Sequence, residues 1–330
     1  MNSRARVESA ISSGKVDRAP AGAWGHTYRE EWSAEALAKV TIGRQQRYGW
    51  DFVKFQPRAS CFAEAFGAEY QSANHSLRAP HELSHPIHGH GDWVNLPKVD
   101  ASAPALAEQV EAIRLTAAGL GPDVPVIQTV FSPITVAGYL VGKDKRRAVR
   151  DLRKHPEEVL PALDRIADTM IDFSRRSVAA GAAGVFYAIS GYASAGMMSA
   201  EEYERWLYPL DKRVLDALPK SAWFNVLHLC RGNLHFDIAR RLPVQVVSWS
   251  VADPGNPSLA EGRKLSGKAV MGGLGHRTTL NRGTPDEVTQ ETRDAMRETG
   301  GTGFLLAPGC SVPPGARQAN LVAMMTAVAG

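Results

Sequence analysis

The stretch PEEVLPALDRIADTMIDFSRRSVAAGAAGVFYAIS, residues 156–190, holds the two patterns on which the fold depends. Apolar residues recur at spacings of three and four up to Gly181, which predicts an amphipathic helix that ends at the glycine. The short apolar run AGVFYAIS (183–190) follows at once and predicts a β-strand. A long helix followed directly by a buried strand is the repeating unit of an α/β fold.

The same alternation of apolar runs and helical stretches extends along the chain. Eight strands separated by helices are what a (β/α)8 barrel requires. We therefore predict an α/β fold, a (β/α)8 TIM barrel in a single domain over residues 1–330, with an N-terminal helical extension and an elaboration near 71–100. The other seven runs are PAGAWG (20–25), FVKFQ (52–56), VPVIQTVF (124–131), AWFNVLHL (222–229), VQVVSWS (244–250), KAVMGGLG (268–275) and GFLLAPG (303–309).

Two further stretches between these runs have helical patterns. SAEEYERWLYPLDKRVLDAL (199–218) opens with Ser199 and has Glu202 three residues later, the spacing of a capping box. The basic run DKRRAVRDLRK (144–154) is interleaved with acidic and apolar residues, so we interpret it as the solvated face of a helix.

Composition excludes several classes of protein. The chain has 330 residues, of which 44% are hydrophobic and 22% charged, as in a globular protein with a large core. The net charge of +4 is too small to indicate a nucleic-acid partner. No run approaches the ~18 apolar residues of a membrane span, and the polar N-terminus is no secretory signal. Three cysteines make no disulfide framework, which favours a cytoplasmic location.

The segment FNVLHLCRGN (224–233) ends a predicted strand with two metal-ligating residue types. Residues at i and i+2 of a strand point to the same side, so His228 and Cys230 should project together. Cys310 ends the last strand run, and in a closed barrel the fifth and eighth strands end on the same face. The three side chains are therefore candidates for one zinc ion, with ordinary packing as the alternative.

Other polar residues at predicted strand ends are candidates for contact with a substrate. Arg58 would bind a carboxylate or phosphate, unless it makes an ordinary surface ion pair. Tyr192 and His276 would line a pocket near the barrel mouth, with packing as the alternative for the tyrosine. Gln128 and His26 complete the candidate set on position alone.

A histidine-rich segment, HELSHPIHGH (81–90), lies in the irregular region after the second run. Its side chains His81, His85, His88 and His90 would suit a second metal site. Because the segment contains Pro and Gly, we favour a mobile surface loop. Cys61 is interpreted as a buried, inert thiol.

The chain resembles the uroporphyrinogen decarboxylase superfamily, and within it the zinc-dependent methylcobalamin:coenzyme M methyltransferase branch. The motif HxC in LHLCRGN followed by the late cysteine of APGCSVPPGARQANLVAM is fairly specific for that branch. The resemblance implies that zinc is bound by His228, Cys230 and Cys310. The segments that carry it are RVESAISSGKVDRAPAG (6–22), RYGWDFVKF (47–55), FSPITVAGYLVG (131–142), LHLCRGN (227–233), GGLGHRTTLNRGTPDEV (272–288) and APGCSVPPGARQANLVAM (307–324).

The sequence departs from the decarboxylase branch at a position that matters for its chemistry. That branch carries an essential Asp before an EALG-like motif, and counting back from EAFG (64–67) places Arg58 there. The Arg-rich N-terminal motif of the decarboxylases is also replaced, by GHTYREEW (25–32). An arginine would repel the cation formed on ring protonation, so uroporphyrinogen decarboxylation is not expected.

Three protein ligands leave a fourth zinc position open, which is typical of a catalytic site. Two thiolates make zinc a weak activator of water but suit the binding of an incoming thiol as its thiolate. We therefore predict a zinc-dependent methyltransferase that moves a methyl group from a methylated corrinoid protein or a small methylated donor to a small-molecule thiol. Asp237 and Glu64 are candidates for a weak fourth ligand at rest.

Two other functions stay open. One is a zinc-dependent lyase or decarboxylase of a small acid, and the other is a corrinoid- or tetrapyrrole-binding barrel with a structural zinc. No DxHxxG corrinoid module occurs in the chain, so a corrinoid would arrive free or on a partner protein. A nucleic-acid or membrane partner is not expected, and a homodimer is kept as an option.

Overall fold

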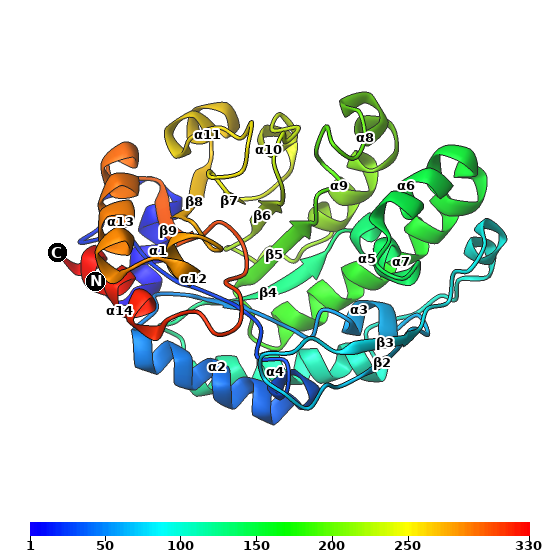
Figure 1. Ribbon diagram of the computed structural model, residues 1–330, viewed down its shortest axis with the longest axis horizontal. Helices are drawn as coiled ribbons and strands as arrows, with labels where there is room; N and C mark the ends of the chain where they lie inside the picture. Colours follow the sequence, from blue (N-terminus) through cyan, green and yellow to red (C-terminus); the bar gives the residue numbers. More distant parts are fainter.

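A curled sheet of seven parallel strands lies at the centre of the structure, a computed structural model that describes residues 1–330 (Figure 1). Each strand pairs only with its neighbours in the order β1-β4-β5-β6-β7-β8-β9, and every pairing is parallel. The strands are β1 (Val53–Phe55), β4 (Val126–Phe131), β5 (Gly184–Ile189), β6 (Val226–Leu229), β7 (Val246–Trp249), β8 (Ala269–Leu274) and β9 (Phe304–Pro308).

The first predicted run occupies the eighth position without forming a regular strand. Ala21 makes an isolated parallel bridge with Leu306 of β9. On its other side the Ala21 carbonyl accepts a hydrogen bond of 2.8 Å from the backbone N–H of Asp51, just before β1. The run therefore lies between the two edge strands, and the Gly and Pro that interrupt it account for its irregular backbone. The predicted α/β barrel is confirmed as a curled parallel sheet.

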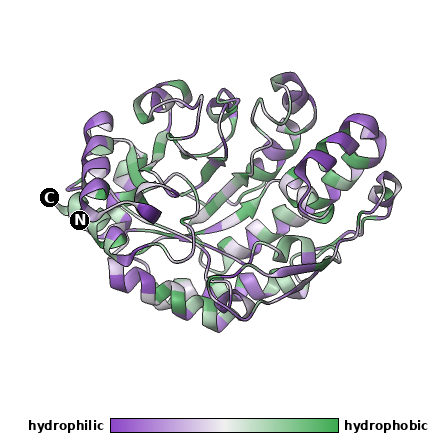
Figure 2. Ribbon diagram, in the orientation of Figure 1, coloured by the Kyte–Doolittle hydropathy of each residue, from purple (hydrophilic) through white to green (hydrophobic).

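Helices surround the sheet on its outer side, and their outer faces are the more hydrophilic (Figures 1 and 2). The bounds are α1 (Ser3–Ile11), η1 (Glu30–Trp32), α2 (Ala34–Tyr48), α3 (Cys61–Glu64), η2 (His90–Asn95), α4 (Pro104–Leu120), α5 (Pro133–Leu140), α6 (Lys145–Lys154), α7 (Pro156–Ala179), α8 (Ala200–Trp206), α9 (Tyr208–Asp216), α10 (Ile238–Arg241), α11 (Leu259–Ser266), α12 (Thr279–Arg282), α13 (Pro285–Thr299) and α14 (Gln318–Ala329).

The helix predictions hold with one correction. Helix α7 and helix α6 form where they were expected, and α6 buries Ala148, Val149 and Leu152 beneath its basic face. The stretch 199–218 was expected as one helix, but it forms two, α8 and α9. Pro209 explains the break, since it has no N–H to continue the hydrogen bonding of α8. The predicted capping box at Ser199 is present.

Alternate residues of the strands face two different layers. One buried cluster contains Phe186, Val226 and Met271 from three strands, and it forms the inside of the curled sheet. Val7 of helix α1, the predicted N-terminal extension, joins this inner cluster and so lies at one end of it. The intervening residues, such as Leu227, belong to the larger cluster between the sheet and the helices. His228, two residues after Val226, therefore faces the inside.

The elaboration near 71–100 is more regular than expected. Strands β2 (Glu69–Gln71) and β3 (His81–Ser84) form an antiparallel hairpin, with a bulge between Glu69 and Tyr70. The short helix η2 follows and buries Trp93 completely. The expected surface loop at 81–90 is thus half of a hairpin joined to a docked helical turn.

Helical segments give no indication of a membrane span, because none combines the length and the apolar character that crossing a bilayer requires.

Candidate metal centre and its pocket

Three potential metal ligands meet where two strands end. His228 lies near the end of β6, Cys230 follows it, and Cys310 comes two residues after β9. Their ligand atoms all lie within 4.8 Å of one another. Both strands run in the same direction within the sheet, so the cluster lies at the carboxyl ends of the strands, where α/β barrels carry their active sites.

The imidazole of His228 is held in place and keeps one nitrogen free. Its Nδ1 lies 3.3 Å from the hydroxyl of Ser248 on β7, and its ring stacks on Phe186 at 5.0 Å between centroids. The other nitrogen, Nε2, is buried and has no hydrogen-bond partner. A buried imidazole nitrogen with no protein partner, beside two thiols, has the chemistry of a metal ligand. The residues present therefore fit a zinc ion.

The two thiols of the cluster differ in their acidity. The neighbouring Cys230 thiol, together with the His228 ring, holds the pKa of Cys310 well below its ordinary value. The same pairing, reinforced by burial, raises the pKa of Cys230. The pair therefore favours one thiolate beside the His228 ring, the form of a thiol that binds a cation.

The backbone around the cluster is strained where the side chains must converge. Arg231 and Asn233, directly after the HxC motif, have positive φ angles of 87° and 52°. A Cβ atom on Gly309 would lie 2.7 Å from the Cα of Ser250, so only glycine allows the β9 end to approach β7 this closely. Strain of this kind concentrates at functional sites.

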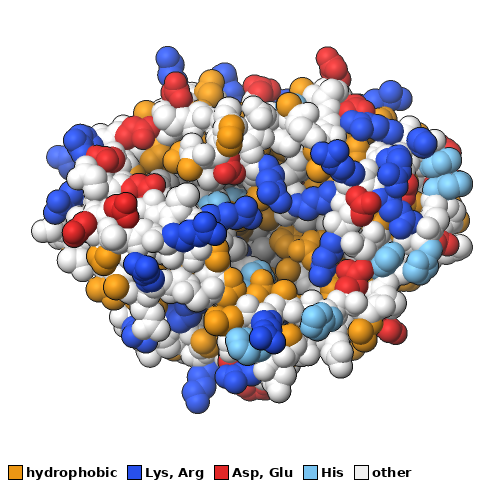
Figure 3. All heavy atoms as spheres, in the orientation of Figure 1, with side chains coloured by type: hydrophobic (Ala, Val, Ile, Leu, Met, Phe, Trp, Pro, Cys, Tyr) orange, Lys and Arg blue, Asp and Glu red, His pale blue; other side chains and the backbone are white.

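A pocket of about 260 Å³ opens onto the two thiols. Its charged side chains are Arg231, Asp253 and Arg277, and His276 lies beside them. Burial lowers the pKa of His276, which favours its neutral form. His276 was predicted as a substrate contact, and the structure places it on this wall. Figure 3 shows a hollow near the centre of the face in view, with Lys and Arg side chains along its border.

Two lysines lie close to the cluster, Lys54 buried and Lys145 half-buried. The Nζ of Lys54, on the inner side of β1, sits 4.8 Å from the ring centroid of Phe186, whose ring stacks on His228. Burial lowers the pKa of Lys54 to about 7, partly offset by the negative charge of Cys310. Lys145 donates a hydrogen bond of 2.6 Å to the carbonyl of Ser190, and burial lowers its pKa while Cys230 opposes that shift.

His26 belongs to a hydrogen-bonded chain that reaches the cluster from the first run. Its Nδ1 lies 2.8 Å from Glu31, and its Nε2 lies 3.0 Å from the amide nitrogen of Gln56. The Gln56 oxygen accepts hydrogen bonds from Lys54 at 2.5 Å and from Ser311, next to Cys310, at 3.3 Å. His26 therefore contacts the cluster only through other residues, and its predicted role as a substrate contact stays a prediction.

Arg58 is buried in a network of ion pairs. Its guanidinium binds both oxygens of Glu64 at 2.9 Å, Glu108 at 2.6 Å and the carbonyl of Glu31, and it stacks over Trp32. Each of its three nitrogens already has a protein partner. This network disfavours the predicted binding of a substrate carboxylate or phosphate by Arg58. Glu64 is equally engaged, which disfavours it as a candidate for the weak fourth ligand at rest.

The remaining predicted residues have mixed placements. Tyr192 is fully buried, its hydroxyl has no partner, and burial raises its pKa. Gln128 is also fully buried, but Ile127 faces the inside of the sheet, so Gln128 points toward the helices. The structure therefore does not support Gln128 as a substrate contact. Asp237 is largely exposed and pairs with Arg241 at 3.2 Å, away from the cluster.

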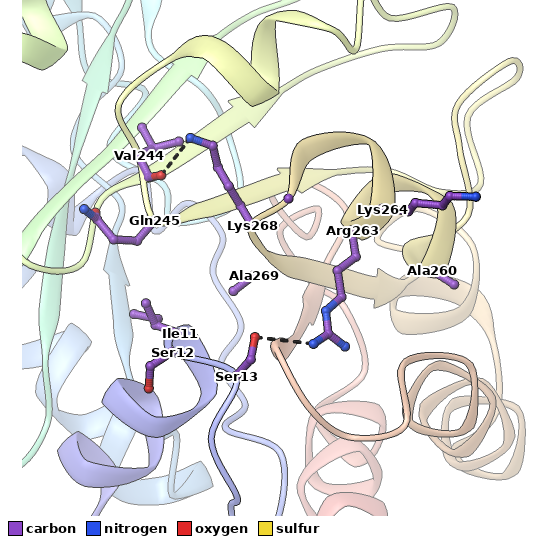
Figure 4. Close-up of a pocket in the computed structure, with 11 residues that line it drawn as sticks. Ile11, Ser12, Ser13, Val244, Gln245, Ala260, Arg263, Lys264, Lys268 and Ala269 are labelled. Atoms are coloured by element: carbon purple, nitrogen blue, oxygen red, sulfur yellow. Dashed lines mark hydrogen bonds between the residues drawn. The ribbon is translucent and has the colours of Figure 1, made fainter.

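A larger cavity of about 760 Å³ lies at the opposite ends of the strands, where β7 and β8 begin (Figure 4). Lys268 there donates hydrogen bonds to the carbonyls of Leu242 and Val244, and Arg263 donates to Ser13. The cavity has no His, Cys or acidic side chain in its lining. Because Lys268 and Arg263 are engaged and the cavity lies at the amino ends of the strands, we assign it no catalytic role.

Together, the curled parallel sheet and the His-Cys-Cys cluster define an α/β barrel protein with a candidate metal centre at its active-site face. The chain belongs to the uroporphyrinogen decarboxylase (URO-D) family, whose model matches residues 6–330.

Named proteins that are similar to this chain in sequence include members of two groups. The methylcobamide:CoM methyltransferase MtbA of Methanosarcina mazei is 24% identical over 97% of this chain and 95% of its own. The methylcobamide:CoM methyltransferase MtaA of Methanosarcina barkeri is 26% identical over 89% of this chain and 84% of its own. The uroporphyrinogen decarboxylase of Myxococcus xanthus is 28% identical, over 62% of this chain and 58% of its own.

Solved structures agree with this fold. A methyltransferase from Methanosarcina mazei superimposes with a TM-score of 0.82 over 99% of this chain and 98% of its own, at 22% identity. A B12-independent methionine synthase from Shewanella gives a TM-score of 0.59 over 90% of this chain and 86% of its own, at 15% identity. Both show the fold alone.

Sequence reasoning missed several residues around the centre. Lys54 is the one charged residue in the apolar run FVKFQ. A lysine inside a predicted buried strand is rare, so it could have been noted as a candidate functional residue. Arg231 follows the HxC motif directly and Arg277 follows His276, so both could have been found as neighbours of candidate ligands. Lys145 and Asp253 gave no signal, because only the folded chain brings them near the thiols.

Proposed function

We propose that this protein is a zinc-dependent methyltransferase that transfers a methyl group to a small thiol. The donor is a methylated corrinoid, free or on a partner protein, or another small methylated molecule. The observation that carries the proposal is the cluster of His228, Cys230 and Cys310 around a buried imidazole nitrogen without a partner. The methylcobamide:CoM methyltransferase names of two relatives support the reaction class.

The protein ligands determine what the centre can do. His228, Cys230 and Cys310 would hold zinc with one tetrahedral position open, where the ion stabilises an incoming thiol as its thiolate. Ser248 and Phe186 fix the orientation of the His228 ring, so that Nε2 faces the metal position.

Charge balance gives a role to the two lysines near the thiols. A divalent ion with two protein thiolates is neutral, and a third thiolate gives the centre one net negative charge. Lys54 and Lys145, both drawn toward their charged forms by the thiols, would offset that charge inside a poorly hydrated site. The desolvation that otherwise lowers the pKa of each lysine should then be overcome when the thiolate binds.

The adjoining pocket suggests what the thiol carries. A volume of about 260 Å³ lies just below the range of pockets for drug-sized ligands, so it suits a small thiol. Arg231 and Arg277 in its lining favour an acidic group at the far end of that molecule. Asp253 limits the net positive charge there, so a small monoanionic thiol fits better than a polyphosphate.

Methylcobalamin and a panel of small thiols test the reaction directly. Methyl transfer breaks the Co–CH3 bond with both electrons left on cobalt, forms the S–CH3 bond and releases the thiol proton. Turnover should therefore produce the thioether together with cob(I)alamin, which is followed by absorbance. Anionic thiols should react faster than neutral thiols of the same length. If no thiol is methylated by a corrinoid or another methyl donor, the proposal fails.

A second candidate has support from other relatives. Uroporphyrinogen decarboxylases match 62% of the chain or less, and they leave a zinc-dependent lyase or decarboxylase of a small acid as the alternative. We propose that uroporphyrinogen itself is not the substrate, since Arg58 and its carboxylate partners occupy the position aligned with the essential Asp of that branch. Release of CO2 from a small acid would support the alternative.

A further inference from the structure

A second cluster of metal-ligating side chains comes from segments that are distant from the thiols in sequence, and its ligand types are different. His90 begins η2, His155 joins α6 to α7, and Glu158 lies in the first turn of α7. Their ligand atoms also lie within 4.8 Å of one another. Figure 3 shows His side chains gathered at the edge where Figure 1 draws α6 and the β2–β3 hairpin. This cluster contains no cysteine.

The two imidazoles and the carboxylate are already in contact. The rings of His90 and His155 stack with 3.7 Å between centroids and 7° between planes. The Nδ1 of His90 lies 2.8 Å from Glu158, so one nitrogen of His90 is oriented by a carboxylate. The three side chains therefore already converge, and an ion bound between them would replace the contact between His90 and Glu158.

The backbone that carries His90 is firmly attached to both helices. Trp93 is completely buried, and its Nε1 donates to Asp151 of α6 at 3.3 Å. Arg165 of α7 donates to the carbonyls of Trp93 and Val94 at 3.1 Å. Asp92 accepts from the backbone N–H groups of residues 88 and 89, which fixes the turn before His90. The ligands therefore come from elements whose relative positions are fixed, as a preorganised site requires.

Positive and negative groups near the cluster have opposite effects on the binding of a cation. The amino end of α7 is a positive dipole end and disfavours a cation. Glu157 and Glu158 in its first turn offset this, and Arg153 is turned away in an ion pair with Glu202. The side chain of His90 is 52% exposed, so solvent can supply the remaining ligands.

We propose that His90, His155 and Glu158 form a second metal site, for a divalent transition-metal ion such as Zn²⁺. Two nitrogens and one oxygen suit zinc, nickel or copper, whereas calcium and magnesium prefer all-oxygen sites. The bound ion fastens the segment that follows the hairpin to the junction of α6 and α7. This site is independent of the thiol centre and of the proposed reaction.

Zinc titration of the untagged protein by calorimetry tests the site. A Cys230→Ala, Cys310→Ala double variant removes the thiol centre, so that any remaining Zn²⁺ binding reports the second cluster. In that background His90→Ala should weaken Zn²⁺ binding by about tenfold or more. His81→Ala, which changes an exposed histidine of the β2–β3 hairpin that precedes η2, should leave it unchanged.

Two results would overturn the proposal. One is that the double variant takes up no Zn²⁺ at micromolar to millimolar concentration. The other is equal uptake with and without His90, which would place the ion elsewhere. If His90→Ala is poorly folded, the same titration can be made with His155→Ala in the double-variant background. Loss of the His155 imidazole should weaken Zn²⁺ binding to a similar extent.

Discussion

Cys230 and Cys310, which follow the sixth and the last strand of the fold, have sulfur atoms within 4.8 Å of each other and of the His228 imidazole. Only the parallel course of the strands brings them together, since β6 and β9 are separated in the sheet by β7 and β8. The account of function given above depends on this convergence. It leads to predictions about the metal, the buried charges and the substrate.

Loss of one thiol should remove the metal without unfolding the chain. Cys310→Ala should lower the zinc content from about one ion per chain to near zero at the thiol centre, measured after dialysis. The thermal unfolding midpoint should change little, because Cys310 follows β9 and is no part of the buried core. Cys61→Ala, at a buried cysteine outside the cluster, is the matched control and should keep its zinc. Collapse of the fold in Cys310→Ala would instead indicate a structural ion.

Removal of the Lys54 charge should weaken thiol binding. Lys54→Met keeps the length of the side chain and its packing against Phe186, but it leaves the thiolate-loaded centre with an uncompensated negative charge. We expect the affinity for thiols to fall by roughly tenfold, about 1.4 kcal/mol, with the zinc content unchanged. Lys54→Arg should restore much of the affinity. Equal thiol affinities in wild type and Lys54→Met would show that the charge is irrelevant.

Uroporphyrinogen should not be decarboxylated. Arg58 binds Glu64 and Glu108, and it leaves no carboxylate free to hold a protonated pyrrole ring. Incubation of purified protein with uroporphyrinogen should give no coproporphyrinogen by chromatography. Detection of that product would mean that the alignment of Arg58 with the decarboxylase Asp, or its interpretation, is wrong.

Stability should depend on pH through a buried carboxyl group that is remote from the thiols. Asp211 on α9 accepts hydrogen bonds from Tyr187 and Tyr203, and burial raises its pKa from 3.8 to about 7. Between these two pH values the unfolded chain loses the proton while the folded chain keeps it. The contribution to the free energy of unfolding is therefore full below about pH 4 and falls by about 1.4 kcal/mol per pH unit up to about pH 7.

Urea unfolding at pH 5 and pH 7 measures this effect against Asp211→Asn, which cannot ionise. Wild type should lose up to about 3 kcal/mol more than the variant between the two pH values. If the two proteins respond to pH in parallel, the Tyr187 and Tyr203 hydrogen bonds stabilise the carboxylate at least as much as burial destabilises it.

Much of the fold could be predicted because its strands are short, apolar and regularly separated. The first run was predicted as a strand but forms only a bridge, since its Gly and Pro weaken the ladder. The 199–218 stretch divides into two helices near Pro209, and the proline could have predicted this break. The hairpin at 69–84 was missed because its strands are short and polar, with no apolar alternation to reveal them.

The site was predictable to the extent that local spacing determines geometry. His228 and Cys230 share a strand end, and Cys310 follows from barrel topology. Gln128 was predicted as a substrate contact without considering which face of the sheet its side chain lies on. Since Ile127 faces the inside, the side chain of Gln128 points toward the helices. Arg58 was recognised at its position, but its three carboxylate and carbonyl partners come from separate segments that no sequence pattern joins.

Zinc K-edge absorption spectroscopy with and without a thiol substrate tests the central claim most directly. The resting protein should show two sulfur ligands at ~2.3 Å and one imidazole nitrogen, and a thiol that supports turnover should add a third sulfur at the same distance. Binding should release close to one proton per chain at pH 7, detectable with an indicator dye, because the thiol binds as its thiolate. A shell of oxygen and nitrogen alone, or a sulfur count that stays at two while the thiol is methylated, would contradict the account.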